Sequence, residues 1–168
     1  FMGLVGSEMC IRDRFYFSLK RTLFSRNRGS RRSGLMQDYL LRVYYEDTDA
    51  QGVVYYANYL KFFERARTEF LREVGYEQMK LMQEKIIFVV RGLELNLLKP
   101  ARLDDKLIIK TSLIKLGKVS FDFEQVASVN DHKIAKANIK CGCLHSETFS
   151  PSPLPEYLHN GMKKLLLT

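Results

Sequence analysis

The 168-residue sequence contains no tryptophan, only 3 cysteines, and no long apolar segment. Because no run of about 18 or more apolar residues occurs, no membrane-spanning helix is expected. Cys141 and Cys143 stand two residues apart on a predicted strand, where the geometry for a mutual disulfide is poor. This cysteine usage fits a reducing compartment better than secretion, so we predict a cytoplasmic protein.

Metal-binding and serine-hydrolase patterns are also missing. The histidines, His132, His145 and His159, show no metal-ligand spacing with one another or with the cysteines. No Gly-x-Ser-x-Gly motif occurs. We therefore predict no metal site and no serine nucleophile.

The positive charge is concentrated at one end of the chain. Residues 1–35 carry 8 Lys/Arg and 2 Asp/Glu, whereas residues 36–168 carry 19 and 17. Since the basic excess belongs to the first segment, nucleic-acid binding is not expected of the remainder. We predict a basic leader over 1–35, which is non-native sequence, a disordered tail or a targeting segment, followed by one domain over 36–168.

Hydrophobic periodicity predicts one long helix and five strands. The helix is expected over residues 57–74, with Gly75 ending it and a shorter helical piece at 76–84. Its apolar face is expected to consist of Leu60, Phe63, Ala66, Phe70, Leu71 and Val74. The strands are expected at residues 39–46, 86–98, 106–116, 119–129 and 133–144. The last four are joined by short connections, so we expect antiparallel neighbours and an α+β fold, with a curved sheet around one helix.

The connection before the long helix contains the residues most suggestive of chemistry. Asp49 lies in an acidic, glycine-containing turn, and Tyr56 stands at the helix entry. Free backbone N–H groups at a helix N-terminus polarise a carbonyl, and a nearby carboxylate activates water or attacks directly. This combination is typical of acyl transfer, although aspartate is also common in such turns for structural reasons.

The stretch Asp47–Tyr59 (DTDAQGVVYYANY), with FFERARTE at 62–69, resembles the signature of hot-dog-fold acyl-CoA thioesterases. It is most similar to the Tol-Pal-associated branch of the 4-hydroxybenzoyl-CoA thioesterase-like family. The segments FVVR at 88–91 and PARLDD at 100–105 agree with that branch in type and order. The resemblance implies a hot-dog fold and hydrolysis of an acyl-CoA thioester to free acid and coenzyme A.

The resemblance assigns catalysis to Asp49 and Tyr56. Asp49 aligns with the family's acid, acting as general base or as nucleophile. The Tyr56 backbone N–H aligns with the oxyanion donor, but the branch typically has histidine at this position. A tyrosine hydroxyl, with a pKa of about 10, is a poorer base than imidazole, so we expect the N–H alone to contribute. Glu64 is the rival acid, because other hot-dog branches place theirs on the central helix.

Six further residues are expected to bind substrate or support the site: Gly52, Val53, Tyr55, Asn58, Phe88 and Arg91. Gly52 is expected to adopt a backbone conformation that other residues resist, and Asn58 to cap the helix or orient the acid. Arg91 follows three apolar residues, so it is expected to pair with Glu64 or Glu94 or to meet a coenzyme phosphate.

The resemblance also predicts partners. An exposed edge strand favours a homodimer, and the family commonly forms homotetramers. Acyl-CoA is the expected substrate, acyl carrier protein an additional partner, and no cofactor is expected beyond the coenzyme A of the substrate. The alternative is a non-catalytic module that binds acyl-CoA or acyl carrier protein. A hot-dog dehydratase is disfavoured because no histidine occurs between Met36 and Asp131.

Overall fold

The structure is a computed structural model that describes residues 37–73 and 78–166. The predicted leader, Val74 and Gly75 lie outside these residues. The elements in chain order are β1 Gln37–Arg42, a 3-10 turn η1 Tyr45–Asp47, α1 Asn58–Glu73, α2 Gln78–Gln83, β2 Ile86–Leu97, β3 Lys106–Leu116, β4 Ser120–Val129, β5 His132–His145 and α3 Glu156–Leu166.

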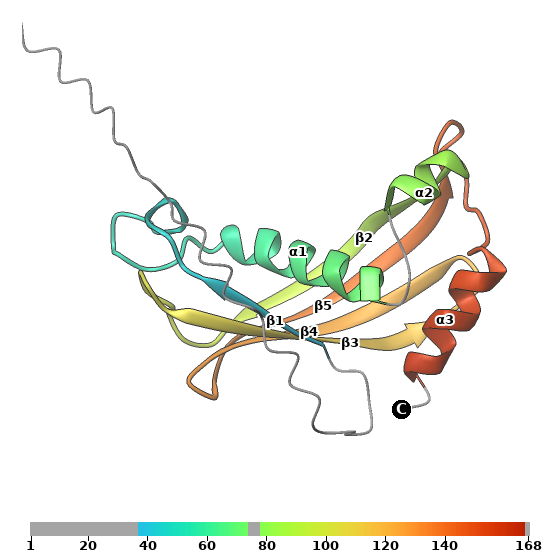
Figure 1. The fold of residues 1–168 in the computed structure, drawn as a ribbon. Coiled ribbons are helices and arrows are strands. Elements are labelled where there is room, and N and C mark those ends of the chain that lie inside the picture. The colour runs from blue at the N-terminus through green and yellow to red at the C-terminus, as the bar shows by residue number, and fades with distance from the viewer. Residues whose placement is uncertain (1–36, 74–77, 167–168) are drawn as a thin grey trace, which may run out of the picture. The chain divides into compact units, whose positions relative to one another are not determined.

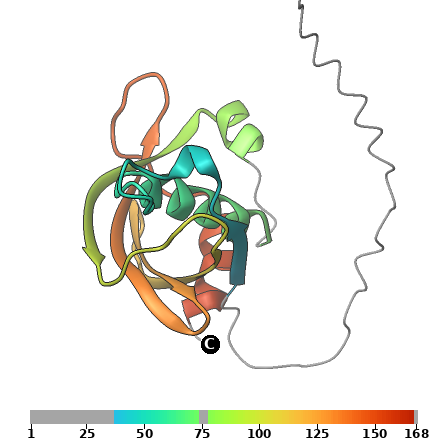
Figure 2. The ribbon, with the colours of Figure 1, turned by 90° about the vertical axis from the view of Figure 1, so that its left-hand side faces the viewer.

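Five strands form one antiparallel sheet in the order β1-β3-β4-β5-β2. The sheet curves around α1, which lies along its concave face (Figures 1 and 2). The predicted α+β hot-dog layout is therefore confirmed. The apolar face of the long helix packs against the sheet, and the curvature of the sheet brings several strands into contact with that helix.

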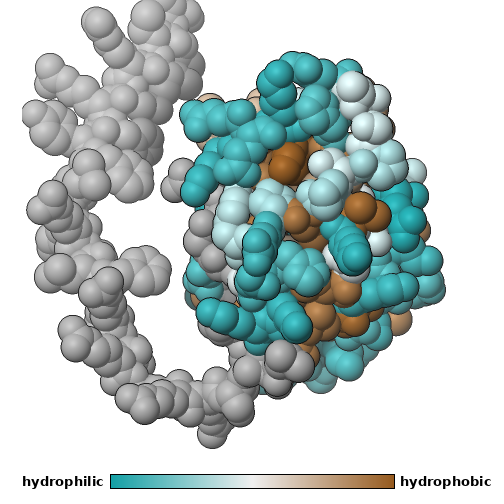
Figure 3. Space-filling view, turned by 90° about the vertical axis from the view of Figure 1, so that its right-hand side faces the viewer, coloured by the Kyte–Doolittle hydropathy of each residue, from teal (hydrophilic) through white to brown (hydrophobic). Residues whose placement is uncertain are grey.

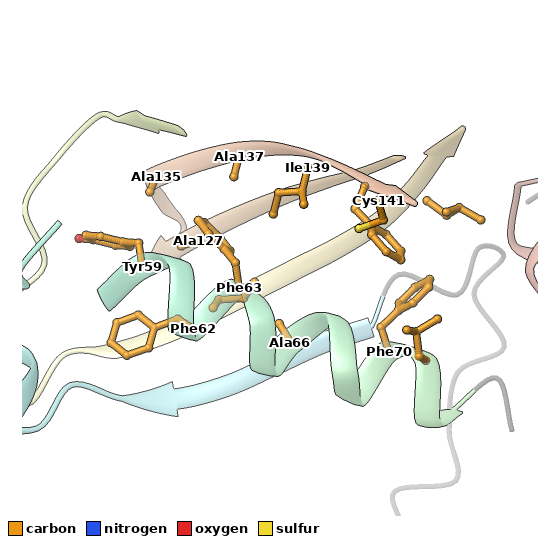
Figure 4. Packing of buried hydrophobic residues seen from close by; sticks show 14 of the residues in the cluster. Tyr59, Phe62, Phe63, Ala66, Phe70, Ala127, Ala135, Ala137, Ile139 and Cys141 are labelled. Carbon is orange, nitrogen blue, oxygen red and sulfur yellow. The ribbon is translucent and has the colours of Figure 1, made fainter. Parts of the chain in front are cut away.

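The core lies between α1 and the sheet. Phe63 and Phe70 project from α1 toward the sheet, where the small side chains of Ala127, Ala135 and Ala137 lie at the Phe63 end of the helix and Cys141 lies at the Phe70 end (Figure 4). Small residues on the sheet leave room for the helix aromatics, and this keeps packing dense. Phe70 and Phe121 each meet the Phe123 ring edge-on, at centroid distances of 5.6 and 5.5 Å.

Two details of the predicted helix and first strand are wrong. Leu60 is 37% exposed, whereas Tyr59 and Phe62 are buried in its place. The buried stripe of α1 therefore extends toward these aromatics and not toward Leu60. β1 ends at Arg42 instead of residue 46, since the Asp47 carboxylate accepts the Tyr44 N–H at 2.9 Å and the chain turns.

The expected pairing of β2 with the next strand in sequence is also wrong. β2 pairs with β5, on the far side of the sheet from β1. Residues 98–105 carry the chain across, held where Leu98 N–H donates to Ile134 O at 2.8 Å and Val54 N–H donates to Ala101 O at 2.8 Å. This crossing segment becomes a wall of the site described below.

α3 is an element that the sequence analysis did not predict. Its buried residues Leu158 and Met162 are four positions apart, and the helix follows directly after Pro155. These two features of the sequence could have predicted the helix. α3 packs on β3, and the Tyr157 hydroxyl donates to Glu84 Oε2 at 2.9 Å. Viewed from the α2 and α3 end, the domain surface is mainly hydrophilic, with hydrophobic patches between (Figure 3). Of the helices that the structure describes, none is long and apolar enough to span a membrane.

Candidate active site

Asp47 and Asn58 hold the connection before α1 in place. Besides binding the Tyr44 N–H with its carboxylate, Asp47 accepts through its carbonyl the Tyr55 N–H at 2.9 Å and the Asn58 side-chain amide at 3.0 Å. Both residues are almost fully buried. Asn58 is thus the first helical residue and a support for the loop, and its bond goes to Asp47 rather than to Asp49.

Asp49 sits in a tight turn beside this anchor. Its backbone N–H donates to Val53 O and its carbonyl accepts the Gly52 N–H, both at 2.9 Å. Gly52 has φ +72°, the left-handed conformation expected for it. The carboxylate accepts the Gln51 N–H at 2.9 Å, and the end of the Gln51 side-chain amide lies beside it, where an amide rotation would place the nitrogen 3.0 Å from Oδ1. These neutral donors hold the carboxylate without placing an opposite charge against it.

Asp49 lines a cavity of about 340 Å³ at the N-terminal end of α1. Val53, Tyr56 and the buried Tyr59 line it with Asp49. Its other wall comes from Leu97, the last residue of β2, and from the crossing-segment residues Leu98, Lys99 and Pro100. The volume is in the range of small-molecule sites. Tyr59 and this wall were not predicted, because their proximity depends on the crossing between β2 and β3.

The Tyr56 N–H takes no part in the backbone hydrogen bonds of the loop. Among the described residues neither Tyr56 N–H nor Ala57 N–H has an acceptor, whereas the Asn58 N–H donates to Tyr55 O at 2.9 Å. Unpaired N–H groups at a helix N-terminus favour negative charge. The Tyr56 ring is largely exposed and lies 4.6 Å from that of Tyr55, whose pKa is raised by a hydrogen bond with the Tyr56 hydroxyl.

Phe88 and Arg91 are not among the residues that line the cavity containing Asp49. Phe88 packs edge-on against Phe121, with ring centroids 4.9 Å apart, and lines a second, smaller cavity beside the middle of α1. Arg91 is exposed at an irregularity in the pairing of β2, between Val90 and Gly92. Of the described carboxylates, neither Glu64 nor Glu94 forms an ion pair with it.

Glu64, the rival acid, lies on the exposed side of α1. Its carboxylate accepts the Thr68 hydroxyl at 2.8 Å, and it borders the smaller cavity rather than the one that contains Asp49. The partly buried charge on this helix is instead Arg67, which the sequence analysis passed over. Its position four residues after Phe63 and three before Phe70 places it at the edge of the buried face, and that spacing was the available signal.

The described residues contain no cluster of three or more side chains suited to a metal ion. Cys141 and Cys143 are buried free thiols. Burial raises the pKa of Cys143 to about 11 and also raises that of Cys141, so both are inert thiols near neutral pH. The larger cavity is thus lined both by Asp49, which carries a carboxylate, and by Tyr56, whose backbone N–H has no acceptor among the described residues.

Comparison with known proteins identifies similar chains. The sequence model of the Thioesterase superfamily matches residues 51–135. The acyl-CoA thioesterase YbgC of Haemophilus influenzae is 42% identical over 117 residues, 69% of this chain and 86% of that protein. A probable thioesterase from Bartonella henselae has a TM-score of 0.67 at 38% identity, covering 71% of this chain and 99% of that one. The gentisyl-coenzyme A thioesterase BH1999 has a TM-score of 0.69 at 29% identity, covering 75% and 99%.

Proposed function

Because the chain belongs to the Thioesterase superfamily, we propose that it hydrolyses acyl-CoA thioesters at the cavity between Asp49 and the start of α1. The activity class, an acyl-CoA thioester hydrolase, follows from relatives of that activity at 42% identity. The observation that carries the location is a half-exposed carboxylate lining the same cavity as Tyr56, whose N–H has no acceptor in the described part of the chain.

In the proposed reaction the thioester carbonyl oxygen receives the Tyr56 N–H as negative charge develops on it. Such a donor typically contributes about 2.7–4 kcal/mol to the transition state. With Asp49 as general base, the carboxylate takes a proton from water while the water oxygen bonds to the carbonyl carbon. The carbon–sulfur bond then breaks, and the proton on Asp49 passes to the thiolate of coenzyme A.

With Asp49 as nucleophile, its oxygen bonds to the carbonyl carbon and the thiolate leaves. Water then cleaves the resulting mixed anhydride and restores the carboxylate. The two routes differ in whether an acyl group becomes attached to the protein. Rapid quenching followed by mass analysis of the peptide containing Asp49 separates them, since only the second route adds the mass of the acyl group.

Thiol release from a panel of acyl-CoAs, from short aliphatic to benzoyl, tests the proposal. The variants are Asp49→Asn, Glu64→Gln and, as a control in the same loop, the exposed Glu46→Gln. We expect Asp49→Asn to lower kcat on the order of 100-fold or more, with the other two near wild type. A large loss in Glu64→Gln with normal turnover in Asp49→Asn would move the working acid to the helix. No turnover on any ester would favour the acyl-binding module.

We propose that the chain is at least a homodimer formed through β2. This strand has 12 residues and lies at the sheet edge, and Val90, Leu93 and Leu97 on it are about half exposed. Long apolar edges are usually covered by pairing. Such pairing also offers Phe88 and Arg91 a route to the partner's substrate. The molar mass of the wild type and of Leu93→Glu, measured by light scattering, tests this proposal. A monomeric wild type would contradict it.

A homotetramer, association with acyl carrier protein and a link to the Tol-Pal system remain predictions of the family resemblance, and the cytoplasmic location remains a prediction from the cysteine usage. The 42% identity to YbgC proteins supports the choice of branch.

A further inference from the structure

The middle of α1 holds a partly buried guanidinium, that of Arg67, which forms no ion pair among the described residues and is attracted only at longer range by Glu64. Arg67 Nη1 donates to Gln125 Oε1 at 2.8 Å. The ion pairs in the described part of the chain are Arg42–Asp104, Arg72–Glu69, Lys85–Glu147 and Lys136–Glu124, and none includes Arg67. Burial lowers the pKa of Arg67, which remains charged near neutral pH. A guanidinium in such a place is usually paired.

Gln125 orients Arg67 but leaves its charge uncompensated. This side chain is fully buried, and its amide nitrogen donates to Phe63 O at 3.0 Å and to Thr111 Oγ1 at 2.8 Å. With the nitrogen committed to two acceptors, the amide oxygen faces Arg67. The network fixes the position of the guanidinium, and a neutral amide accepts only part of its five N–H groups.

Arg67 lines the smaller cavity, which has a volume of about 120 Å³. The apolar walls include Leu71, Phe88, Phe121, Phe123 and Val90, with Cys141 beside the guanidinium. Since water occupies about 30 Å³ per molecule, the space suits roughly four waters or one small organic group. Glu64 is the nearby carboxylate at the rim, exposed and bonded to Thr68, and Asp122 acts on Cys141 from β4.

We propose that this cavity is a binding site for the carboxylate of a short organic acid, with Arg67 holding the anion and the phenylalanine wall packing its apolar body. Arginine suits carboxylates because its planar N–H groups form two parallel bonds to them. The cavity has a charged end and an apolar end. An inorganic anion would contact only the charged end, and a neutral acyl tail only the apolar end.

Two sources supply this chemistry. One is a free acid, such as a product of thioester hydrolysis. The other is the far carboxylate of a dicarboxylic acyl group, which rests on the proposed function. The first is tested by binding without turnover, and the second by comparing substrates, so failure of the proposed hydrolysis does not affect the first test.

The binding test uses butyrate and benzoate against butanamide and benzamide, which have the same shape without the charge. Calorimetry and thermal unfolding are measured at constant ionic strength on the full chain. We expect the carboxylates to bind and to raise the melting temperature, and the amides to have little effect. In Arg67→Gln the dissociation constant for benzoate should rise about tenfold or more. Arg65→Gln, an exposed neighbour on α1, should behave as wild type.

A second variant covers the case in which Arg67→Gln fails to fold. Val90→Glu places a negative charge at the mouth of the cavity, on a half-exposed strand position, and should also weaken benzoate binding about tenfold. Leu93→Glu, on the same strand but outside the cavity, controls for effects on association. Equal binding of acid and amide, or unchanged benzoate binding in both Arg67→Gln and Val90→Glu, would overturn the site and leave Arg67 hydrated by water.

The substrate test compares glutaryl-CoA with pentanoyl-CoA. A kcat/KM preference for the glutaryl ester that Arg67→Gln removes identifies the acyl carboxylate as the ligand. Benzoate binding without such a preference identifies a free acid instead. The absence of both benzoate binding and the glutaryl preference would contradict the proposal.

Discussion

The first turn of α1 and its middle present two different ways of meeting negative charge. At the first turn, backbone N–H groups without acceptors border an open cavity, and Asp49 is held by main-chain donors of its own loop. In the middle, the Arg67 side chain meets a smaller cavity and is held by a buried glutamine. Partial charges on the backbone suit an oxyanion that exists only briefly, while a full guanidinium charge suits a permanent anion. One helix thus offers a transient and a lasting anion site.

The two regions also differ in how they are built. The Asp49 turn rests on local hydrogen bonds between residues two to four apart. The Arg67 site rests on Gln125 and Thr111, which come from β4 and β3. We therefore expect substitutions in the first region to alter activity more than stability, and those in the second to do the reverse.

The largest expected effect is a loss of activity on substitution of Asp49, in the first of the two regions. Asp49→Asn should lower kcat on the order of 100-fold or more while changing the free energy of unfolding by less than about 1 kcal/mol. Parallel kinetics and urea unfolding measure both. A large loss of stability in this variant would show that Asp49 is a structural residue of the turn.

Gln125→Leu should produce the opposite result. It removes the acceptor of Arg67 and the donor to Phe63 O and Thr111, so we expect destabilisation of about 2–4 kcal/mol. Glu124→Gln, the adjacent residue, which pairs on the surface with Lys136, should cost about 1 kcal/mol or less. Equal losses of unfolding free energy in the two variants, measured by urea unfolding, would mean that the buried network stabilises the fold no more than the surface ion pair does.

Gly52→Ala tests the turn itself. A Cβ at this position meets no atom within 4 Å, so any cost comes from the backbone, which has φ +72°. We expect about 1–2 kcal/mol of destabilisation, together with reduced kcat because the turn carries Asp49. Gly92→Ala, where no positive φ is required and a Cβ would be 3.8 Å from the Lys140 side chain, is the matched control. Similar losses in both variants would contradict a conformational role.

Tyr56→Phe should have a small effect, within about threefold in kcat, because the backbone N–H is retained. Tyr55→Phe serves as the comparison, since the two rings are in contact, with centroids 4.6 Å apart. A loss near that of Asp49→Asn, confined to Tyr56→Phe, would assign acid–base chemistry to the hydroxyl.

The smallest expected effect concerns Tyr157, whose pKa is raised to about 12 by burial and by its bond to Glu84. The folded-state pKa lies above the ordinary 10, so its stabilising contribution is present below pH 10 and is lost as the pH rises toward 12. Tyr157→Phe should remove this part of the pH dependence of unfolding. An unchanged profile between pH 10 and 12 would show that the contact between α2 and α3 does not contribute.

Much of the fold followed from short-range patterns. The strand predicted at residues 106–116 has the bounds of β3, and the helical spacing of Phe63, Ala66 and Phe70 predicted the buried side of α1. In the site, the left-handed conformation of Gly52 agrees with expectation. These features depend on neighbours within a few residues, so the local sequence is sufficient to predict them.

Other features required the assembled sheet. Arg91 and Arg67 both follow apolar residues, but Arg91 lies on an exposed edge while Arg67 borders a cavity closed by β4 and β5. The wall at Leu97–Pro100 exists because β2 pairs with β5 and the chain must cross to reach β3.

By itself, the sequence determined the five strands, the long helix, most of its apolar face and the acid-bearing turn, because side-chain periodicity and turn chemistry act over a few residues. The tertiary structure decided the strand order, the two cavities along α1 and which arginine borders a cavity without an ion pair. Those depend on how segments far apart in the chain share one core, and hydrophobic burial, being non-directional, does not encode that arrangement in any single stretch.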